Sequence, residues 1–192
     1  GTMGGKAITQ VLFGEYNPSG KLTMTFPLNL GQVPVYYNAK NTGRPIYLPN
    51  DKYKSKYIDS PNDPLFPFGY GLSYTTFEFG KPSVKAKGNN IEVSVTIKNT
   101  GKVAGKEVAE VYVTAPKGAY EKPAKELKTF GKTKLLNPGE SQTLKMTLEK
   151  RDLASFDEAN SQWKVDAGNY LFKIGSDVEN IKGTATLKVA EY

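Results

Sequence analysis

Residues 91–98 read Ile-Glu-Val-Ser-Val-Thr-Ile-Lys, with an apolar residue at every second position and a polar residue between each pair. Successive side chains of a β-strand point to opposite faces, so this spacing predicts a strand with one buried face. The next residues, Asn99-Thr100-Gly101, are typical of a turn that ends a strand. Because one strand cannot bury its own apolar face, the surrounding sequence should supply a second sheet.

The sequence on both sides of this strand keeps the same two-residue period. Apolar residues alternate or share a face in four further stretches, at residues 111–113, 144–148, 170–174 and 185–189. Turn-forming residues separate the stretches at 88–90, 137–139 and 166–168. About seven short strands with regular turns predict an immunoglobulin-like or fibronectin type III-like β-sandwich over residues 79–192. We expect Trp163, the single tryptophan, to lie in its core.

Residues 1–27 have a different pattern. Residues 5–13 predict a short helix with Ala7, Ile8, Val11 and Leu12 on one face, followed by Gly14 as a C-terminal cap. Residues 21–26 alternate and predict a strand. A helix and a strand joined by a turn form the closing unit of an α/β layer, which needs further strands and a sheet to cover. We therefore interpret residues 1–27 as the end of an α/β sandwich domain.

Residues 28–78 form a long aromatic and proline-rich linker in this interpretation, called the ribbon below. Residues 28–79 hold 6 prolines and 11 aromatic residues without a helical or strand period. Loops longer than about 15 residues are uncommon in compact domains, and the aromatic content argues against disorder. The ribbon is therefore expected to lie against a surface of other polypeptide. The predicted fold class is mainly β: a fibronectin type III-like sandwich preceded by the end of an α/β domain and this linker.

Composition excludes several classes of site. The sequence has no cysteine and no histidine, which excludes disulfides, thiolate nucleophiles, Cys/His zinc sites and histidine bases within the chain. No apolar run approaches the ~18 residues of a membrane span. The net charge of +7 comes almost wholly from lysines interspersed with acids, which favours a solvated surface over nucleic-acid binding. We expect no metal and no cofactor.

Several motifs resemble those of glycoside hydrolase family 3 enzymes of the β-glucosidase type, in the family's order and over essentially the whole chain. They are Val-Leu-Phe-Gly-Glu-Tyr-Asn-Pro-Ser-Gly-Lys-Leu at 11–22, Thr-Phe-Pro at 25–27, Tyr-Tyr-Asn at 36–38, Lys-Asn-Thr-Gly-Arg-Pro at 40–45, Pro-Phe-Gly-Tyr-Gly-Leu-Ser-Tyr-Thr at 67–75, Val-Thr-Ile-Lys-Asn-Thr-Gly at 95–101, Lys-Glu-Leu at 125–127 and Leu-Asn-Pro-Gly-Glu-Ser at 136–141.

The resemblance implies a retaining exo-acting β-glycosidase of three parts: a barrel with an aspartate nucleophile, an α/β sandwich with the acid/base, and a fibronectin type III-like domain. Neither catalytic residue maps onto this chain, so its partner would be the N-terminal catalytic portion of the same enzyme and its substrate a β-linked glucoside or oligosaccharide. A periplasmic or secreted location is favoured, and a cytoplasmic one stays open.

The ribbon offers one set of candidate substrate-binding residues: Tyr36, Tyr37, Asn38, Asn41 and Arg44. Tyrosine rings stack on sugar faces, and amides and guanidinium groups bond hydroxyls, so this set suits the rim of a sugar subsite. The alternative is that these residues anchor the linker. The scattered acids form no pattern of a catalytic pair. Two other functions also stay open: a β-xylosidase or another exo-β-glycosidase of the family, and a non-catalytic carbohydrate- or protein-binding module.

Overall fold

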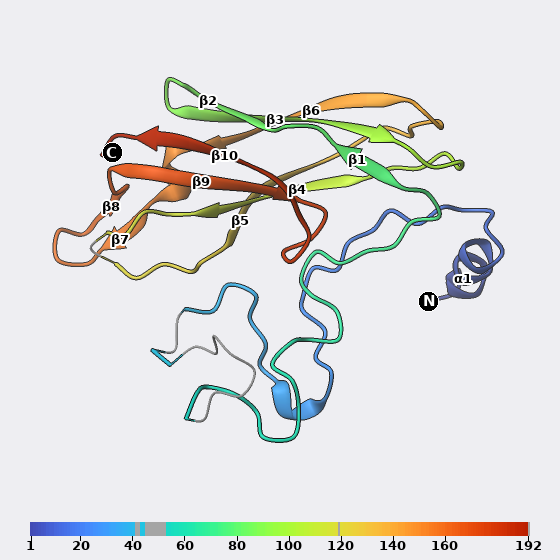
Figure 1. Ribbon diagram of the computed structural model, residues 1–192, viewed down its shortest axis with the longest axis horizontal. Helices are drawn as coiled ribbons and strands as arrows, with labels where there is room; N and C mark the ends of the chain where they lie inside the picture. Colours follow the sequence, from blue (N-terminus) through green and yellow to red (C-terminus); the bar gives the residue numbers. More distant parts are fainter. Residues whose placement is uncertain (41–42, 45–52, 119, 192) are drawn as a thin grey trace.

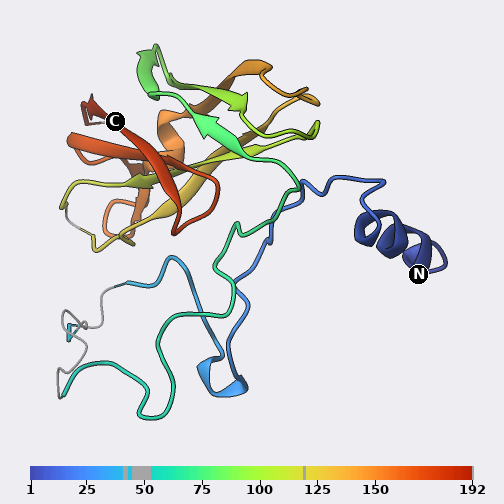
Figure 2. The same ribbon diagram turned by 45° about the vertical axis from the view of Figure 1, so that its right-hand side comes forward.

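The computed structural model describes residues 1–40, 43–44, 53–118 and 120–191. Figure 1 shows three parts: a β-sandwich, a ribbon that leaves the sandwich and returns to it, and helix α1 (Gly4–Leu12), which projects to one side. The turned view in Figure 2 keeps the helix clear of the far loop of the ribbon around η1. No helix in the described part of the chain is long and apolar enough to cross a membrane.

The first sheet of the sandwich is built around one long central strand. It contains β1 (Phe77–Phe79), β2 (Ser83–Lys87), β3 (Asn90–Asn99) and β6 (Ser141–Glu149), all antiparallel to their neighbours. β1 and β2 pair with opposite ends of β3, with Phe79 opposite Ile97 and Val84 opposite Val93. They therefore act as one edge strand that is interrupted by the residues between them.

The second sheet has the order β10-β9-β4-β5 and is also antiparallel. Its strands are β4 (Val108–Thr114), β5 (Glu126–Lys132), β9 (Gly168–Gly175) and β10 (Ile181–Val189). A small hairpin of β7 (Ser155–Asp157) and β8 (Gln162–Lys164) follows the 3-10 turn η2 (Lys150–Leu153). The hairpin lies at one end of the sandwich, near the C-terminus (Figure 1).

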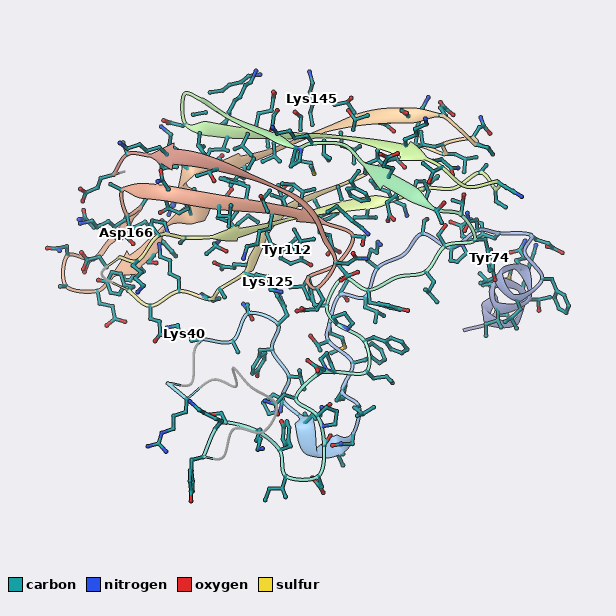
Figure 3. All side chains as sticks on the ribbon, viewed as in Figure 1. Lys40, Tyr74, Tyr112, Lys125, Lys145 and Asp166 are labelled. Carbon is teal, nitrogen blue, oxygen red and sulfur yellow. The ribbon has the colours of Figure 1, made fainter. Side chains whose placement is uncertain are left out.

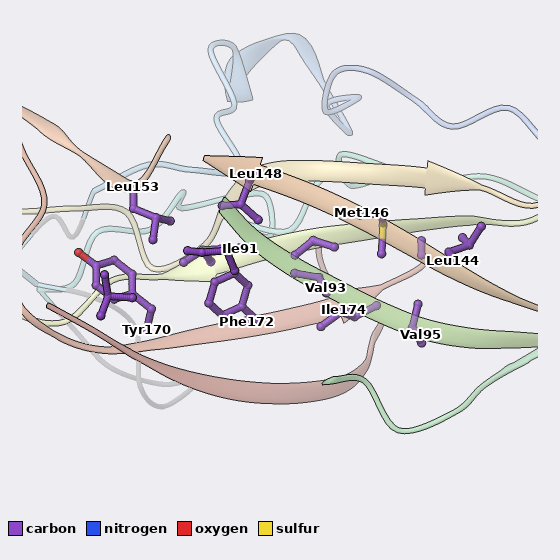
Figure 4. Packing of buried hydrophobic residues seen from close by; sticks show 14 of the residues in the cluster. Ile91, Val93, Val95, Leu144, Met146, Leu148, Leu153, Tyr170, Phe172 and Ile174 are labelled. Atoms are coloured by element: carbon purple, nitrogen blue, oxygen red, sulfur yellow. The ribbon is translucent and has the colours of Figure 1, made fainter. Parts of the chain in front are cut away.

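The core lies between the two sheets, as the alternating pattern predicts. Ile91, Val93, Val95 and Ile97 of β3 are buried, and the residues between them are half-buried or exposed. Figure 4 shows Ile91, Val93 and Val95 packed with Phe172 and Ile174 from the facing sheet. Packing of apolar side chains from two sheets is the main stabilisation of such a fold. The predicted β-sandwich is confirmed.

The second sheet is unusual because its outer face is also covered. Every residue of β4 from Val108 to Val113 is buried. Val111 and Val113 belong to the core between the sheets. Glu110 and Tyr112, which alternate with them, face outward and are 5% and 0% exposed. Tyr37 packs edge-on against Tyr112 at 6.0 Å between ring centroids. The ribbon thus covers the outside of β4.

The ribbon consists of two limbs held together by polar and aromatic contacts. Gln32, in the 3-10 turn η1 (Leu30–Gln32), is 1% exposed. Its Oε1 accepts the Leu28 N–H at 2.6 Å, and its Nε2 donates to the carbonyls of Pro61 and Asp63 at 2.8 and 3.1 Å. Because two of these hydrogen bonds go to residues 29 and 31 positions further along the chain, the buried amide fixes one limb against the other.

Two predictions for individual segments are wrong. Residues 21–26 form no strand; Phe26 makes one isolated bridge with Phe66, and Met24 and Phe26 are 63% and 43% exposed. Their apolar side chains have no sheet layer beside them. Trp163 does not lie in the core; it is 52% exposed on β8, because the hairpin projects beyond the sandwich while Tyr170 and Phe172 fill the interior.

Helix α1 follows the prediction in its bounds but buries nothing. None of its nine residues is buried, and Ile8 and Leu12 are 61% and 72% exposed. Gly14 has a φ of +76°, and its N–H reaches the Val11 carbonyl at 3.1 Å, as a C-terminal cap should. A nine-residue helix is marginal in isolation and normally depends on packing of its apolar face.

Candidate functional site

The motif at residues 67–75 joins the ribbon to the sandwich. Gly69 has a φ of +81°, and a Cβ added there would lie 2.1 Å from Oε2 of Glu110. A Cβ at Gly71 would lie 2.4 Å from the carbonyl oxygen of Gly20. Only glycine permits this backbone conformation and this approach without strain. The two glycines of the motif therefore bring the returning limb into contact with β4 and with the turn before residue 21.

The returning limb of the ribbon lies on the buried carboxyl group of Glu110. The hydroxyl of Tyr112 donates a hydrogen bond to Oε2 of Glu110. Burial raises the pKa of Glu110, and the Tyr112 hydrogen bond and the Lys21 ammonium partly oppose that shift. Burial also raises the pKa of Tyr112, with the Glu110 hydrogen bond adding to the effect. Such a pair holds its geometry only while water stays excluded.

Three acids meet at this junction, although the sequence gave no sign of their proximity. Asp177 and Glu107 both act on Glu110 through their charge. Each has a structural partner: Glu107 pairs with Lys21 at 3.0 Å, and Oδ1 of Asp177 accepts the N–H groups of Glu179 and Asn180. Because Gly69 lies on the Glu110 carboxyl, a sugar has no access to it. The cluster is structural, and the sequence marks only one of its members, Glu110, as a glutamate within a mostly apolar strand.

The side-chain amide of Asn17 holds the remaining segments of the junction together. Oδ1 of Asn17 accepts the Tyr74 N–H at 2.8 Å and the Ser73 hydroxyl at 3.0 Å, and its Nδ2 donates to the Ala104 carbonyl. The Tyr74 hydroxyl donates to the Val11 carbonyl at 2.7 Å, close to the end of α1 (Figure 3). Residues 11–17, the motif and the sandwich are thus held in one network.

Of the predicted substrate-binding residues that the structure describes, Tyr36, Tyr37 and Asn38 line one groove, and Arg44 is not among its lining residues. Tyr37 stacks on Phe68 at 4.2 Å between centroids, and its hydroxyl accepts the Leu127 N–H at 3.2 Å. Burial raises its pKa. Its neighbour Tyr36 is 68% exposed. Arg44 is also exposed, and its carbonyl accepts the Ser55 N–H. Asn41 lies outside the described residues.

Tyr36, Tyr37 and Asn38 line an apolar groove of about 380 Å³. Volumes of this size are typical of small-ligand pockets. The groove has apolar walls with few polar groups, and Met24 and Tyr36, which both line it, are exposed. Its other lining residues include Thr23, Thr25, Pro27 and Phe68. Among the described residues, no three acidic side chains gather as metal ligands would.

Comparison with known proteins assigns the chain to a family. A model of the glycosyl hydrolase family 3 C-terminal domain matches residues 1–74, and one of the fibronectin type III-like domain matches residues 107–178. The chain belongs to the C-terminal region of glycosyl hydrolase family 3. The resemblance of the sequence motifs to family 3 is thereby confirmed.

Individual relatives agree with this assignment. A periplasmic β-glucosidase of Salmonella typhimurium is 44% identical over 95% of this chain and 24% of its own length. A putative β-xylosidase of Formosa agariphila is 38% identical over 95% of this chain and 23% of its own length. The crystal structure of a Listeria innocua β-glucosidase in complex with glucose superposes with a TM-score of 0.88 at 37% identity, covering 98% of this chain and 26% of that one. The chain spans about a quarter of these proteins.

Proposed function

We propose that this family 3 chain serves as the C-terminal structural part of a retaining exo-acting β-glycosidase that hydrolyses terminal β-glucosyl residues. The catalytic carboxylates would lie in a preceding portion with a barrel and an α/β sandwich. The names of the relatives support a β-glucoside as substrate. The raised pKa of Glu110 does not make it a catalytic acid, because Gly69 and Tyr112 cover it.

One observation carries the proposal: the apolar sides of α1 and of residues 24–36 are exposed. Ile8, Leu12, Met24, Leu30 and Tyr36 are each more than 60% exposed. Large apolar side chains that are exposed together on one element mark an interface. A preceding portion of the same protein would cover α1 with strands and the ribbon with its own surface, and this accounts for both exposed sides at once.

Within that enzyme, we place Tyr36, Asn38, Asn41 and Arg44 at the rim of the sugar site, with Tyr37 as the residue that holds them there. Tyr36 exposes its ring beside the groove, while Tyr37 is fixed to β5 and Phe68. A rim residue stacks on the sugar without taking part in bond cleavage. Tyr36→Ala should therefore raise KM for an aryl β-glucoside several-fold and leave kcat nearly unchanged.

The test of the proposed function is reconstitution. The preceding portion and the 192-residue chain are purified separately, and hydrolysis of p-nitrophenyl β-glucoside and p-nitrophenyl β-xyloside is measured for each and for the mixture. We expect turnover only in the mixture, with the higher kcat/KM for the glucoside. Turnover by the pure chain alone would place the catalytic groups within it and contradict the proposal.

The second candidate is a β-xylosidase, favoured by the relative from Formosa agariphila. A higher kcat/KM for the xyloside in the same assay would decide for it. The two sugars differ by one hydroxymethyl group, which a pocket in the preceding portion would admit or exclude.

A further inference from the structure

A second aromatic surface lies at the far end of the sandwich from α1, and the hydrolase proposal does not use it. Phe156 of β7 and Trp163 of β8 are directly paired across the hairpin, so both side chains lie on one face. Their rings meet edge to face with centroids 5.5 Å apart, and they are 46% and 52% exposed. Leaving two large rings in water costs free energy that burial elsewhere would recover. Binding of a ligand that covers these two rings would therefore be favourable.

The Trp163 ring is held in place before any ligand arrives. The Arg151 guanidinium lies over it at 5.7 Å from the centroid. A cation over an indole face is a favourable contact, and Phe156 supports the ring edge-on. The capping interaction of Glu149 and Asp152 fixes the η2 turn that carries Arg151. An aromatic ring that is already fixed loses little conformational entropy when it binds.

The aromatic pair borders a groove of about 380 Å³ between the hairpin and β5. Its walls also carry Tyr120 and polar groups of both signs, Glu121, Glu126, Lys122 and Lys128. Lys122 is fixed by an ion pair with Asp166 at 3.3 Å and by the Leu153 carbonyl at 3.4 Å. Rings for stacking, with donors and acceptors beside them, match a pyranose, which has apolar C–H faces and a rim of hydroxyls.

The groove also reaches the ribbon that carries the candidate rim of the sugar site. Lys40 of the ribbon lines it, four residues beyond Tyr36, and Figure 3 shows Lys40 on the sandwich side of the ribbon. Four residues of extended chain span at most about 14 Å, a distance that an oligosaccharide of a few units covers. A protein partner would need a larger and flatter surface, about 800 Å² on each side. The groove is concave and small.

We propose that Trp163, Phe156 and Tyr120 form a binding site for a β-linked gluco-oligosaccharide or glucan chain, which holds a long substrate beside the enzyme. The choice of the β-linked class rests on the proposed function; the site itself rests on the aromatic pair and its groove. Binding at this site involves no bond cleavage. Its effect would be to raise the local concentration of polymeric substrate.

Trp163 provides its own probe because it is the only tryptophan of the chain. Tryptophan fluorescence of the 192-residue chain is titrated with laminarihexaose and with cellohexaose, and with maltohexaose as the α-linked control. We expect a saturable change with at least one β-linked sugar and none with maltohexaose. Phe156→Ala should weaken binding about tenfold, in line with the loss of one aromatic contact. Phe130→Ala removes a ring that is 65% exposed and lies outside the groove, and it should leave binding unchanged.

A second measurement uses the complete protein. Its migration is compared in native gels with and without a soluble β-glucan. Trp163→Ala should lose the retardation, and Trp163→Tyr, which keeps a ring, should retain part of it. Both readouts measure binding and neither needs turnover. A protein without β-glucosidase activity would therefore not contradict the proposed binding site. Conversely, loss of this site would not contradict the hydrolase proposal.

Three results would overturn the site. The first is an absence of response to both β-linked hexasaccharides in solution and in the gel. The second is retardation that persists in both Trp163→Ala and Phe156→Ala, which would assign glucan binding to another surface. The third is loss of association with the preceding portion in Trp163→Ala without any effect on sugar binding, which would make the hairpin a protein interface. An equal response to maltohexaose would overturn the β-linked class.

Discussion

Position 69 places two demands on its residue that only glycine, among the amino acids, satisfies. Its φ of +81° disfavours any side chain, and a Cβ would lie 2.1 Å from the Glu110 carboxylate. We expect Gly69→Ala to cost about 2–4 kcal/mol of unfolding free energy, measured by urea denaturation of the chain, because backbone strain adds to a displaced buried carboxyl. Gly139 has nearly the same φ, +80°, with no atom near its Cβ position, so Gly139→Ala should cost only about 1 kcal/mol. Equal costs would show that the contact with Glu110 has no energetic weight.

Glu110 gives a pH dependence whose sign follows from burial. Because burial raises its pKa, the folded chain holds this proton to higher pH than the unfolded chain does. Stability therefore falls as pH rises from the unfolded value, about 4.3, through the raised folded pKa. Glu110→Gln removes this loss and leaves an amide oxygen for the Tyr112 hydroxyl. The difference in Tm, mutant minus wild type, should become more positive from about pH 4 to about pH 7.

Glu92→Gln is the matched control, and its Tm difference should change with pH in the opposite direction. A hydrogen bond from Lys87 lowers the pKa of Glu92, an acid on the surface of β3. Its stabilisation is present above the unfolded pKa and is lost as pH falls through the folded value. Glu92→Gln should therefore make the Tm difference slightly more negative as pH rises. A Glu110→Gln profile that follows the Glu92→Gln profile would mean that the Glu110 carboxyl is not effectively buried.

Among elements, the ribbon is fixed to the sandwich through the aromatic ring of Tyr37. Tyr37 stacks on Phe68, meets Tyr112 and accepts the Leu127 N–H. Tyr37→Ala should free both limbs and speed proteolytic cleavage within residues 28–78 about tenfold, since cleavage reports local opening. Tyr36→Ala, at the exposed neighbouring position, should change the cleavage rate less than twofold. Electrophoresis of timed digests gives both rates. Similar rates for the two variants would contradict the anchoring role.

Strands with one buried face were predictable from sequence, and short strands were not. The apolar–polar alternation of residues 91–98 and 144–148 continues through β3 and β6 because one face of each strand packs on the core. β1, β7 and β8 have three residues each, too few to show a period. The strand predicted at 21–26 had the right pattern, but pattern alone does not form a ladder without neighbouring strands.

For the candidate site, the sequence indicates the stretch that holds the residues but not the direction of each side chain. Sequence placed Tyr36 and Tyr37 together in one stretch, but adjacent residues of extended chain point to opposite sides. The structure anchors Tyr37 and exposes Tyr36. Trp163 was expected in the core on the general preference of large rings for burial, yet the place of a hairpin relative to the sandwich depends on tertiary contacts. Proximity of Glu107, Glu110 and Asp177 likewise arises from distant segments.

On the scale of the whole molecule, α1 tests the need for a preceding portion. Its apolar face contacts no core, so Ile8→Asp and Leu12→Asp should change the stability of the chain alone by less than about 0.5 kcal/mol. Each should weaken association with the preceding portion about thirtyfold or more, because a charge buried at an interface costs about 2 kcal/mol or more. Calorimetric titration of the two purified parts measures this. Gln10→Asp puts the same charge on the opposite side of α1 and should bind normally; if all three variants bind alike, α1 is not the docking element.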